Sequence, residues 1–175
     1  MDTATVSGLT LATAPTPSLV LDQRKLKRNL ARMAGALRRH NVAFRPHMKT
    51  AKCLEVAQLA TQGQAGGITV STIAEAEFFA AHGFRDQLYS MAIVPSKLDR
   101  IAGIAAEVKL VTDDLDAARA VAAHPKNFRV LIEIDSGAHR AGLLPDDTKL
   151  QDVAKALGVS WRYRRNYSTV VDSPD

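Results

Sequence analysis

Short apolar runs alternate with helix-like segments along most of this chain, and this alternation limits the fold more than any other feature. The runs at residues 68–70, 87–91, 108–111 and 128–134 have the composition of strands, and each is followed by a segment expected to be helical. Such alternation predicts an α/β fold with a parallel sheet and right-handed crossovers. In barrels built this way, the chemistry lies at the carboxyl ends of the strands.

Residues that favour helix N-termini precede several of the expected helices. Asp22 and Thr50 each stand before an apolar stripe at helical spacing, and residues 72–75 (Thr-Ile-Ala-Glu) form a capping box. Ser96 and the acidic run at 113–116 follow the same logic. The three carboxylates in that run could also suggest a metal site. Acidic residues in a first helical turn are favoured by the helix dipole, however, so we predict caps and no metal ligands.

A further strand is expected over residues 43–49, where side chains alternate between two faces. Arg45, His47 and Lys49 share one face, and apolar side chains share the other. A lysine near two other potential cations has its protonated form disfavoured, so its amine becomes more nucleophilic. A Schiff base with a carbonyl cofactor such as pyridoxal phosphate requires this property. The alternatives are a solvated Lys49 and a structural His47, and Pro46 is unusual in a central strand.

Several polar residues follow the ends of expected strands. They are Lys49, Thr72, Asp113, Asp135 and Arg140, which are far apart in the sequence. Because the carboxyl ends of parallel strands meet at one edge, these residues could share one rim.

The composition is that of an ordinary soluble globular protein, with 46% hydrophobic and 23% charged residues. The single cysteine, Cys53, excludes an internal disulfide framework and fits a reducing compartment. The N-terminal residues lack the pattern of a signal peptide, and no stretch approaches the ~20 apolar residues that a membrane span needs. We therefore expect a cytoplasmic protein with no membrane partner.

The net charge of +5 raises the question of nucleic-acid binding. Only 5% of the residues are aromatic, and the sequence contains no recognised nucleic-acid motif. A solvated basic face explains the charge better, so we expect no nucleic-acid partner.

Several motifs together resemble a known family. They are TPSLVLD at 16–22, RPHMKT at 45–50, GGITVSTIAEAEFFAAHGF at 66–84 and EIDSGAHRAG at 133–142. Their order and spacing are similar to those of the alanine racemase-like, fold-type III pyridoxal-phosphate enzymes, on the branch of D-threonine aldolase and eukaryotic-type D-serine dehydratase. The resemblance covers about residues 15–157 and implies a (β/α)8 TIM-type barrel followed by a β-domain.

The resemblance implies roles for four residues. Lys49 would be the catalytic Schiff-base lysine, in agreement with the charge argument above. Arg140 would lie against the cofactor ring near its phenolic oxygen, and His47 and Arg45 would line the same pocket. Thr72, at the end of a strand, is a further candidate for cofactor binding.

The chain departs from the family in two places. Ala51 stands where the family often has a histidine. The resemblance also stops near Leu157, before the remaining barrel strands and the β-domain, which in the aldolase and dehydratase hold the ligands of a divalent metal. We therefore expect a partial barrel of about five of the eight strands, with the C-terminal β-domain missing, from a frameshifted or truncated gene product. The expected organisation is a mobile lead-in (1–17), the partial barrel domain (18–157) and an atypical tail (158–175).

An incomplete barrel would leave open sheet edges and an uncovered apolar interior. Such a piece should form a homodimer, associate with itself through those edges, or be marginally stable. The leading functional prediction is the N-terminal part of a pyridoxal-phosphate lyase for D-amino acids, of the D-threonine aldolase or D-serine dehydratase kind, with little activity of its own. The alternative is a non-catalytic pyridoxal-phosphate-binding module.

Overall fold

The computed structural model describes residues 10–137 and 139–158. The chain divides into two compact units, Met1–His40 and Asn41–Asp175, which are considered separately. In the described part of the first unit the main element is helix α1 (Gln23–Arg39). Asp22 caps this helix as the sequence predicts, because its carboxylate accepts a hydrogen bond from the Lys25 backbone N–H at 3.0 Å. The proposed limits of the barrel domain, 18–157, stay a prediction.

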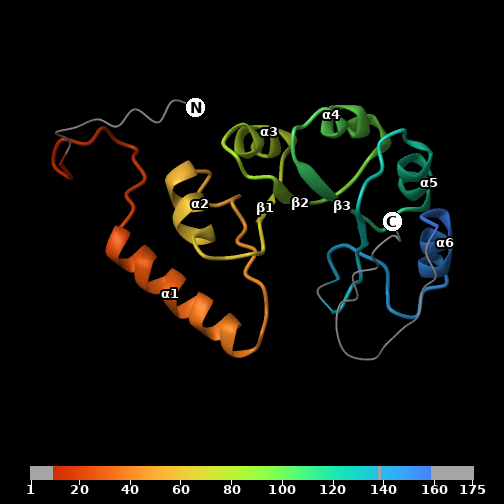
Figure 1. The fold of residues 1–175 in the computed structure, drawn as a ribbon, viewed down its shortest axis with the longest axis horizontal. Helices are drawn as coiled ribbons and strands as arrows, with labels where there is room; N and C mark the ends of the chain where they lie inside the picture. Colours follow the sequence, from red (N-terminus) through yellow and green to blue (C-terminus); the bar gives the residue numbers. More distant parts are fainter. Residues whose placement is uncertain (1–9, 138, 159–175) are drawn as a thin grey trace. The chain divides into compact units, whose positions relative to one another are not determined.

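The second unit contains a four-stranded parallel sheet with the order β1-β2-β3-β4 (Figure 1). The strands are β1 (Ile68–Val70), β2 (Asp86–Ala92), β3 (Glu107–Thr112) and β4 (Val130–Ile132). All three neighbouring pairs are parallel, and the spatial order follows the chain. This arrangement confirms the predicted α/β fold, and consecutive parallel neighbours are how barrel strands succeed one another.

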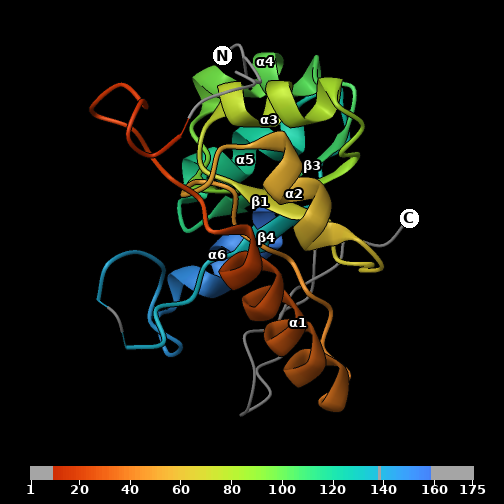
Figure 2. The same ribbon diagram turned by 90° about the vertical axis from the view of Figure 1, so that its left-hand side faces the viewer.

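Helices precede, connect and follow the strands: α2 (Leu54–Thr61), α3 (Ile73–Ala81), α4 (Leu98–Ala102), α5 (Leu115–Ala123) and α6 (Lys149–Ala156). A short 3-10 turn, η1 (Pro95–Lys97), leads into α4. Helices α3, α4 and α5 lie along one face of the sheet (Figures 1 and 2). Within the described ranges, every helix is too short or too polar to cross a membrane.

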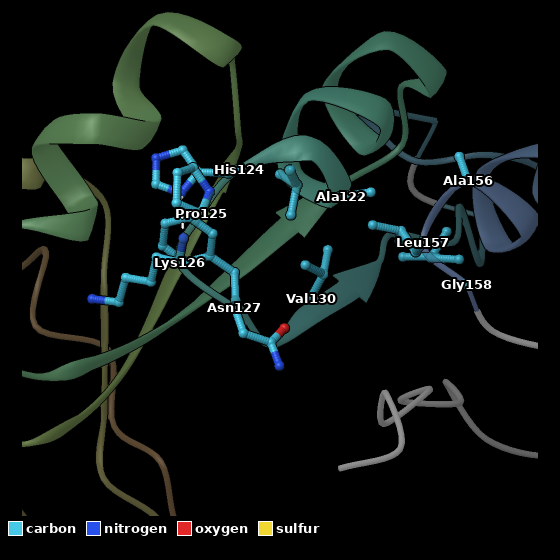
Figure 3. A pocket seen from close by; sticks show the side chains of 12 residues that line it. Ala122, His124, Pro125, Lys126, Asn127, Val130, Ala156, Leu157 and Gly158 are labelled. Atoms are coloured by element: carbon cyan, nitrogen blue, oxygen red, sulfur yellow. Dashed lines mark hydrogen bonds between the residues drawn. The ribbon is translucent and has the colours of Figure 1, made fainter.

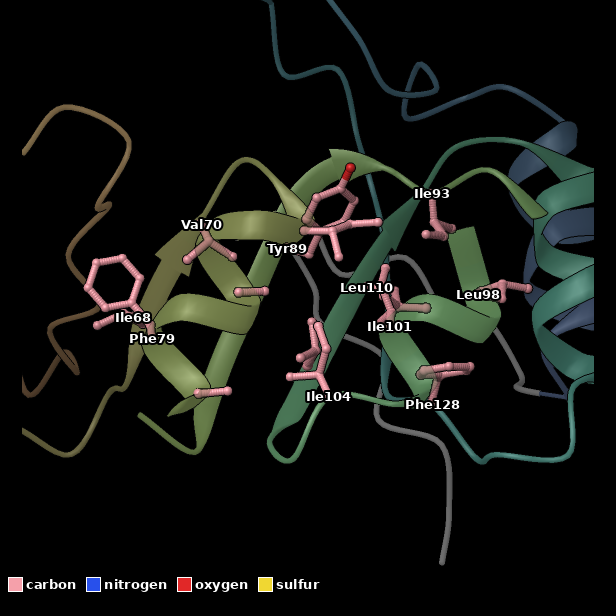
Figure 4. Close-up of a cluster of buried hydrophobic side chains, with 14 of the residues drawn as sticks. Ile68, Val70, Phe79, Tyr89, Ile93, Leu98, Ile101, Ile104, Leu110 and Phe128 are labelled. Carbon is pink, nitrogen blue, oxygen red and sulfur yellow. The ribbon is translucent and has the colours of Figure 1, made fainter. Parts of the chain in front are cut away.

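The main core lies between the sheet and these helices (Figure 4). Because side chains alternate along a strand, β1, β2 and β3 turn alternate residues toward the helices. The side chains that meet there are buried and come from strands, helices and loops: Ile68, Val70, Phe79, Tyr89, Ile93, Leu98, Ile101, Ile104, Leu110 and Phe128. A second cluster packs α6 against α5 and β4, with Ala118, Ile132, Leu150, Val153 and Ala154. The opposite face of the strands carries polar residues, including Asp86, Ser90 and Lys109.

The strand expected at 43–49 shrinks to a single parallel bridge between His47 and Thr69. The Thr69 N–H donates to the Pro46 carbonyl at 2.9 Å, and the Met48 N–H donates to the Thr69 carbonyl at 2.8 Å. Pro46 has no N–H to extend this ladder, and the chain turns directly after the bridge. The segment still occupies the position of a first strand beside β1.

The predicted helix caps divide into those that form and those that do not. Thr72 caps α3 and Asp114 caps α5, each by accepting a backbone N–H three residues on. The prediction for Thr50 is wrong, because Lys52 adopts a left-handed φ of 46° and α2 begins only after it, with Cys53 at the N-cap. The prediction for Ser96 is also wrong, because the chain enters η1 at Pro95 and no side chain caps α4.

Candidate active site

A polar cluster lies at the carboxyl ends of β1 and β2, around the ring of His47. The His47 Nε2 atom is 3.1 Å from the Ser90 hydroxyl oxygen and 3.3 Å from that of Ser71. Ser71 is the first residue after β1, and Ser90 lies in the second half of β2. The Ser90 hydroxyl donates in turn to the Val70 carbonyl at 3.2 Å. Three elements thus bring their polar side chains to one point.

The hydrogen bonds around His47 indicate which ring nitrogen carries the proton when the ring is neutral. Its Nδ1 atom accepts the backbone N–H of Lys49 at 3.2 Å, so the neutral ring carries its proton on Nε2. Because the Ser90 hydroxyl donates to a carbonyl, its oxygen is free to accept that proton. Burial lowers the pKa of His47, and the positive charge of Lys49 lowers it further, against an opposing effect of Glu75. His47 is therefore a neutral hydrogen-bond donor at neutral pH.

Lys49 lies on the turn that follows the His47 bridge. Its side chain is exposed, while its backbone N–H is fixed by the His47 ring. The turn closes where the Lys52 N–H donates to the Met48 carbonyl at 2.9 Å. The left-handed conformation of Lys52 costs about 1–2 kcal/mol for a residue with a Cβ atom. The turn thus presents an accessible primary amine beside a neutral imidazole.

Glu75 lies behind this turn, in the first turn of α3. Its Oε2 atom accepts the Ser71 N–H at 2.8 Å, and its Oε1 atom lies 3.2 Å from the Lys52 Nζ. Burial acts to raise the pKa of Glu75, but the Ser71 N–H and the Lys52 ammonium outweigh it, so the pKa falls below its usual value. Glu75 is therefore a nearly buried carboxylate that stays charged.

Arg45 makes its contacts at the other end of the strands from Lys49. Its guanidinium donates to the Asp86 carboxylate at 2.6 Å and to the Ile68 carbonyl at 3.2 Å. Lys109 binds the other Asp86 oxygen at 2.7 Å. Asp86 begins β2, so this triad lies at the amino ends of the strands, away from Lys49. Since Asp86 neutralises Arg45 and His47 is neutral, the crowding of cations expected from the sequence is weaker in the structure.

A second cluster lies at the carboxyl ends of β3 and β4. Burial raises the pKa of Glu133, and the nearby charge of Asp113 raises it further, while Arg140 partly offsets both. Asp113 also accepts the Gly142 N–H at 2.9 Å, which ties the loop after β4 to the end of β3. Glu133 thus lies between the charges of Asp113 and Arg140 at this edge of the sheet.

Asp135 shapes the loop that carries Arg140. It accepts the backbone N–H groups of Gly137 and His139 at 2.9 and 3.0 Å, and its second oxygen lies 3.0 Å from the His139 Nδ1. These N–H groups lower the pKa of Asp135. Both oxygens of this carboxylate therefore bind groups of the loop itself, and the Arg140 side chain is exposed.

The polar residues that we expected at one rim therefore form two clusters at the carboxyl ends of the strands. His47 and Lys49 meet in the first, next to Thr72, whose hydroxyl accepts the Glu75 N–H; Arg140 belongs to the second. The cofactor-binding roles of Arg45, His47, Thr72 and Arg140 stay predictions. Sequence reasoning named Glu75 only as part of a capping box, and it did not single out four other residues of these clusters: Ser71, Ser90, Lys52 and Glu133. The alternation of polar side chains at strand ends could have indicated Ser90 and Glu133.

A separate cavity of about 440 Å³ lies near the amino end of β4 (Figure 3). Its lining includes His124, Lys126, Phe128 and Leu157. Because these side chains lie at the opposite end of the sheet from Lys49, we do not assign the chemistry to this cavity. Among the described residues, no group of three His, Cys, Asp or Glu side chains could hold a metal ion.

Comparison with known proteins identifies the family. Residues 21–162 match the family model described as "Alanine racemase, N-terminal domain". The chain belongs to this family. Over 148 residues it is 40% identical to the D-threo-3-hydroxyaspartate dehydratase of Delftia sp. (strain HT23), a match that covers 81% of this chain and 39% of the relative. The solved structure of that dehydratase superimposes with a TM-score of 0.78 over 85% of this chain and 41% of its own.

The names of two further relatives state that they act on related amino acids. The chain is 35% identical to D-threonine aldolase of Arthrobacter sp., over 79% of this chain and 38% of the relative. It is 27% identical to D-serine dehydratase of Schizosaccharomyces pombe, over 86% of this chain and 40% of the relative. The chain thus spans about 40% of the length of the curated relatives that it matches.

Proposed function

We propose that this chain forms the N-terminal part of a pyridoxal-phosphate lyase that acts on D-amino acids with a hydroxyl group on Cβ. The names of the three relatives support this substrate class, since 3-hydroxyaspartate, threonine and serine all carry that hydroxyl. The observation that carries the proposal is the position of Lys49 in a chain of this family. Its amine is exposed at the carboxyl ends of the strands, beside a neutral His47.

The side chains at this edge of the sheet have the chemical groups that pyridoxal phosphate would need. Lys49 offers a primary amine to its aldehyde, and the exposed guanidinium of Arg140 suits an anionic phenolic oxygen. His47 offers a donor on Nε2, and Thr72 lies at the N-terminus of α3, where anions are favoured. When bound, the cofactor would supply the electron withdrawal that weakens a bond to the substrate Cα.

The chain's own residues have two tasks in this scheme. Lys49 is the Schiff-base lysine, and His47 and its two serine partners keep the pocket in one hydrogen-bonded arrangement. Cleavage of Cα–Cβ would convert D-threonine into glycine and acetaldehyde. Elimination would convert D-serine into pyruvate and ammonia.

Cofactor binding is the direct test, because the chain spans only part of its relatives. Pyridoxal phosphate added to the full chain should produce an absorbance band near ~420 nm, typical of the cofactor linked to a lysine. Borohydride reduction followed by peptide mass mapping should place the label on Lys49. The Lys49→Ala variant should lose the band, whereas Lys97→Ala should keep it, since Lys97 contacts the Tyr89 hydroxyl at 3.1 Å instead.

Two results would contradict the proposal: a full band in Lys49→Ala, or a label that maps to another lysine. If the label lies on Lys49 but neither D-threonine nor D-serine is consumed, the alternative of a non-catalytic binding module is favoured.

A further inference from the structure

The turn that carries Lys49 contains a residue in an unfavourable backbone conformation. Lys52 has a φ of 46°, in the left-handed region. Its N–H donates to the Met48 carbonyl at 2.9 Å, and the Met48 N–H donates to Thr69 of β1 at 2.8 Å. A residue with a Cβ atom keeps such a conformation only where its surroundings hold it. The contacts of Lys52 therefore decide whether the turn stays formed.

Glu75 supplies the contact that holds Lys52. The Lys52 Nζ lies 3.2 Å from Glu75 Oε1, and the Glu75 side chain is 9% exposed. Glu75 is itself anchored twice: its Oε2 accepts the Ser71 N–H at 2.8 Å, and its backbone N–H donates to the Thr72 hydroxyl at 3.1 Å. The carboxylate is thus fixed on the connection between β1 and α3, and it holds the Lys52 ammonium from there.

We infer that Glu75 is a positioning residue: by pairing with Lys52 it fixes the turn and holds the Lys49 amine where an aldehyde carbonyl can reach it. The inference deepens the proposed function and rests on the role of Lys49 in it. Glu75 acts through the backbone of the turn, from Lys52 to Met48. An amine on a fixed turn spends more time in an attack-ready geometry than one on a loose turn, so it reacts faster.

The test compares the full wild-type chain with Glu75→Gln and with a matched control, Glu77→Gln. Glutamine keeps the size of Glu75 and an acceptor for Ser71, but it removes the charge that holds Lys52. Glu77 lies on the same helix and pairs outward with Arg100 at 2.7 Å, so its variant removes an equal charge without touching the turn. Lys52→Met breaks the same pair from its exposed side and covers the case in which Glu75→Gln fails to fold.

Two measurements are made on each variant. The first is the rate at which pyridoxal phosphate and borohydride label Lys49, followed by peptide mass mapping. The second is hydrogen exchange of the Lys52 amide, which needs no cofactor. We expect Glu75→Gln and Lys52→Met to label about three- to fivefold more slowly, the effect of losing a partly exposed ion pair. Their Lys52 amide should exchange faster, and Glu77→Gln should match the wild type in both measurements.

Each outcome decides the inference. A wild-type labelling rate in Glu75→Gln and Lys52→Met overturns it, even if the amide exchanges faster, because Glu75 would then be merely structural. A slowing in Glu77→Gln as large as in Glu75→Gln overturns it too. If the wild-type chain takes no label on Lys49, the proposed function fails. Amide exchange then decides separately whether Glu75 holds the turn: faster exchange in both variants supports that role, and unchanged exchange refutes it.

Discussion

Replacing Asp86 by asparagine tests the ion-pair triad at the amino end of the sheet. Asp86 binds Arg45 at 2.6 Å and Lys109 at 2.7 Å, and the side chains of the two cations are 24% and 16% exposed. Burial acts to raise the pKa of Asp86, but the two cations outweigh it and hold the pKa below its usual value. The Asp86→Asn variant would leave both largely buried cations beside a neutral amide.

The size of the effect follows from the exposure of the triad. Removing one partner of a fully buried pair costs about 3–5 kcal/mol, and removing one from an exposed pair costs about 0–1 kcal/mol. The Asp86 side chain is 35% exposed, so solvent screens part of the interaction. We therefore expect Asp86→Asn to lower the free energy of unfolding by about 2 kcal/mol, which corresponds to a Tm lower by about 4–8 °C in a chain of this length.

Urea denaturation followed by circular dichroism measures this change. Glu77→Gln is again the matched control, because Glu77 also binds a cation at 2.7 Å but both partners are more exposed, at 42% and 58%. We expect the control to lose less than about 1 kcal/mol. If Asp86→Asn loses no more than the control, the triad does not stabilise the sheet and the reasoning from burial is refuted.

Two further predictions concern the same region. Gly67→Ala should destabilise the chain by about 2–3 kcal/mol, because Gly67 has a φ of 63° and a Cβ atom there would meet Asp86 and Arg45. Gly63→Ala should destabilise it by only about 1 kcal/mol, because Gly63 has a similar φ of 69° but open space around it. Equal losses of stability in denaturation would contradict the steric argument. Stability should also fall in acid, because the pKa values of Asp86 and Glu75 are lowered in the folded chain. The contribution of these carboxylates to stability is complete above their pKa values in the unfolded chain, and it is lost as the pH falls through their folded-state pKa values. Thermal unfolding from pH 7 downward measures this loss, and an Asp86→Asn chain that is as acid-sensitive as the wild type would argue against Asp86 as a source.

The sequence by itself was enough to predict the fold class and to single out Lys49. Alternating apolar runs and helix caps at Thr72 and Asp114 predicted the parallel sheet and two of its helices, because strand and cap preferences depend on near neighbours in the chain. The RPHMKT motif indicated Lys49 by resemblance to a family, and the family match over residues 21–162 confirms that membership. Local patterns were wrong at Thr50 and Ser96, where the backbone at Lys52 and Pro95 decided the helix starts.

Only the tertiary structure decided how the polar residues of this edge interact. The period of a strand placed Arg45, His47 and Lys49 on one face, but it could not show that Asp86, 41 residues from Arg45, takes the guanidinium to the other end of the sheet. Likewise, the hydrogen-bond partners of the His47 Nε2 atom, Ser71 and Ser90, belong to other elements. A hydrogen bond or an ion pair depends on distances of a few ångströms between side chains, and for residues far apart in the sequence only the packed sheet sets those distances.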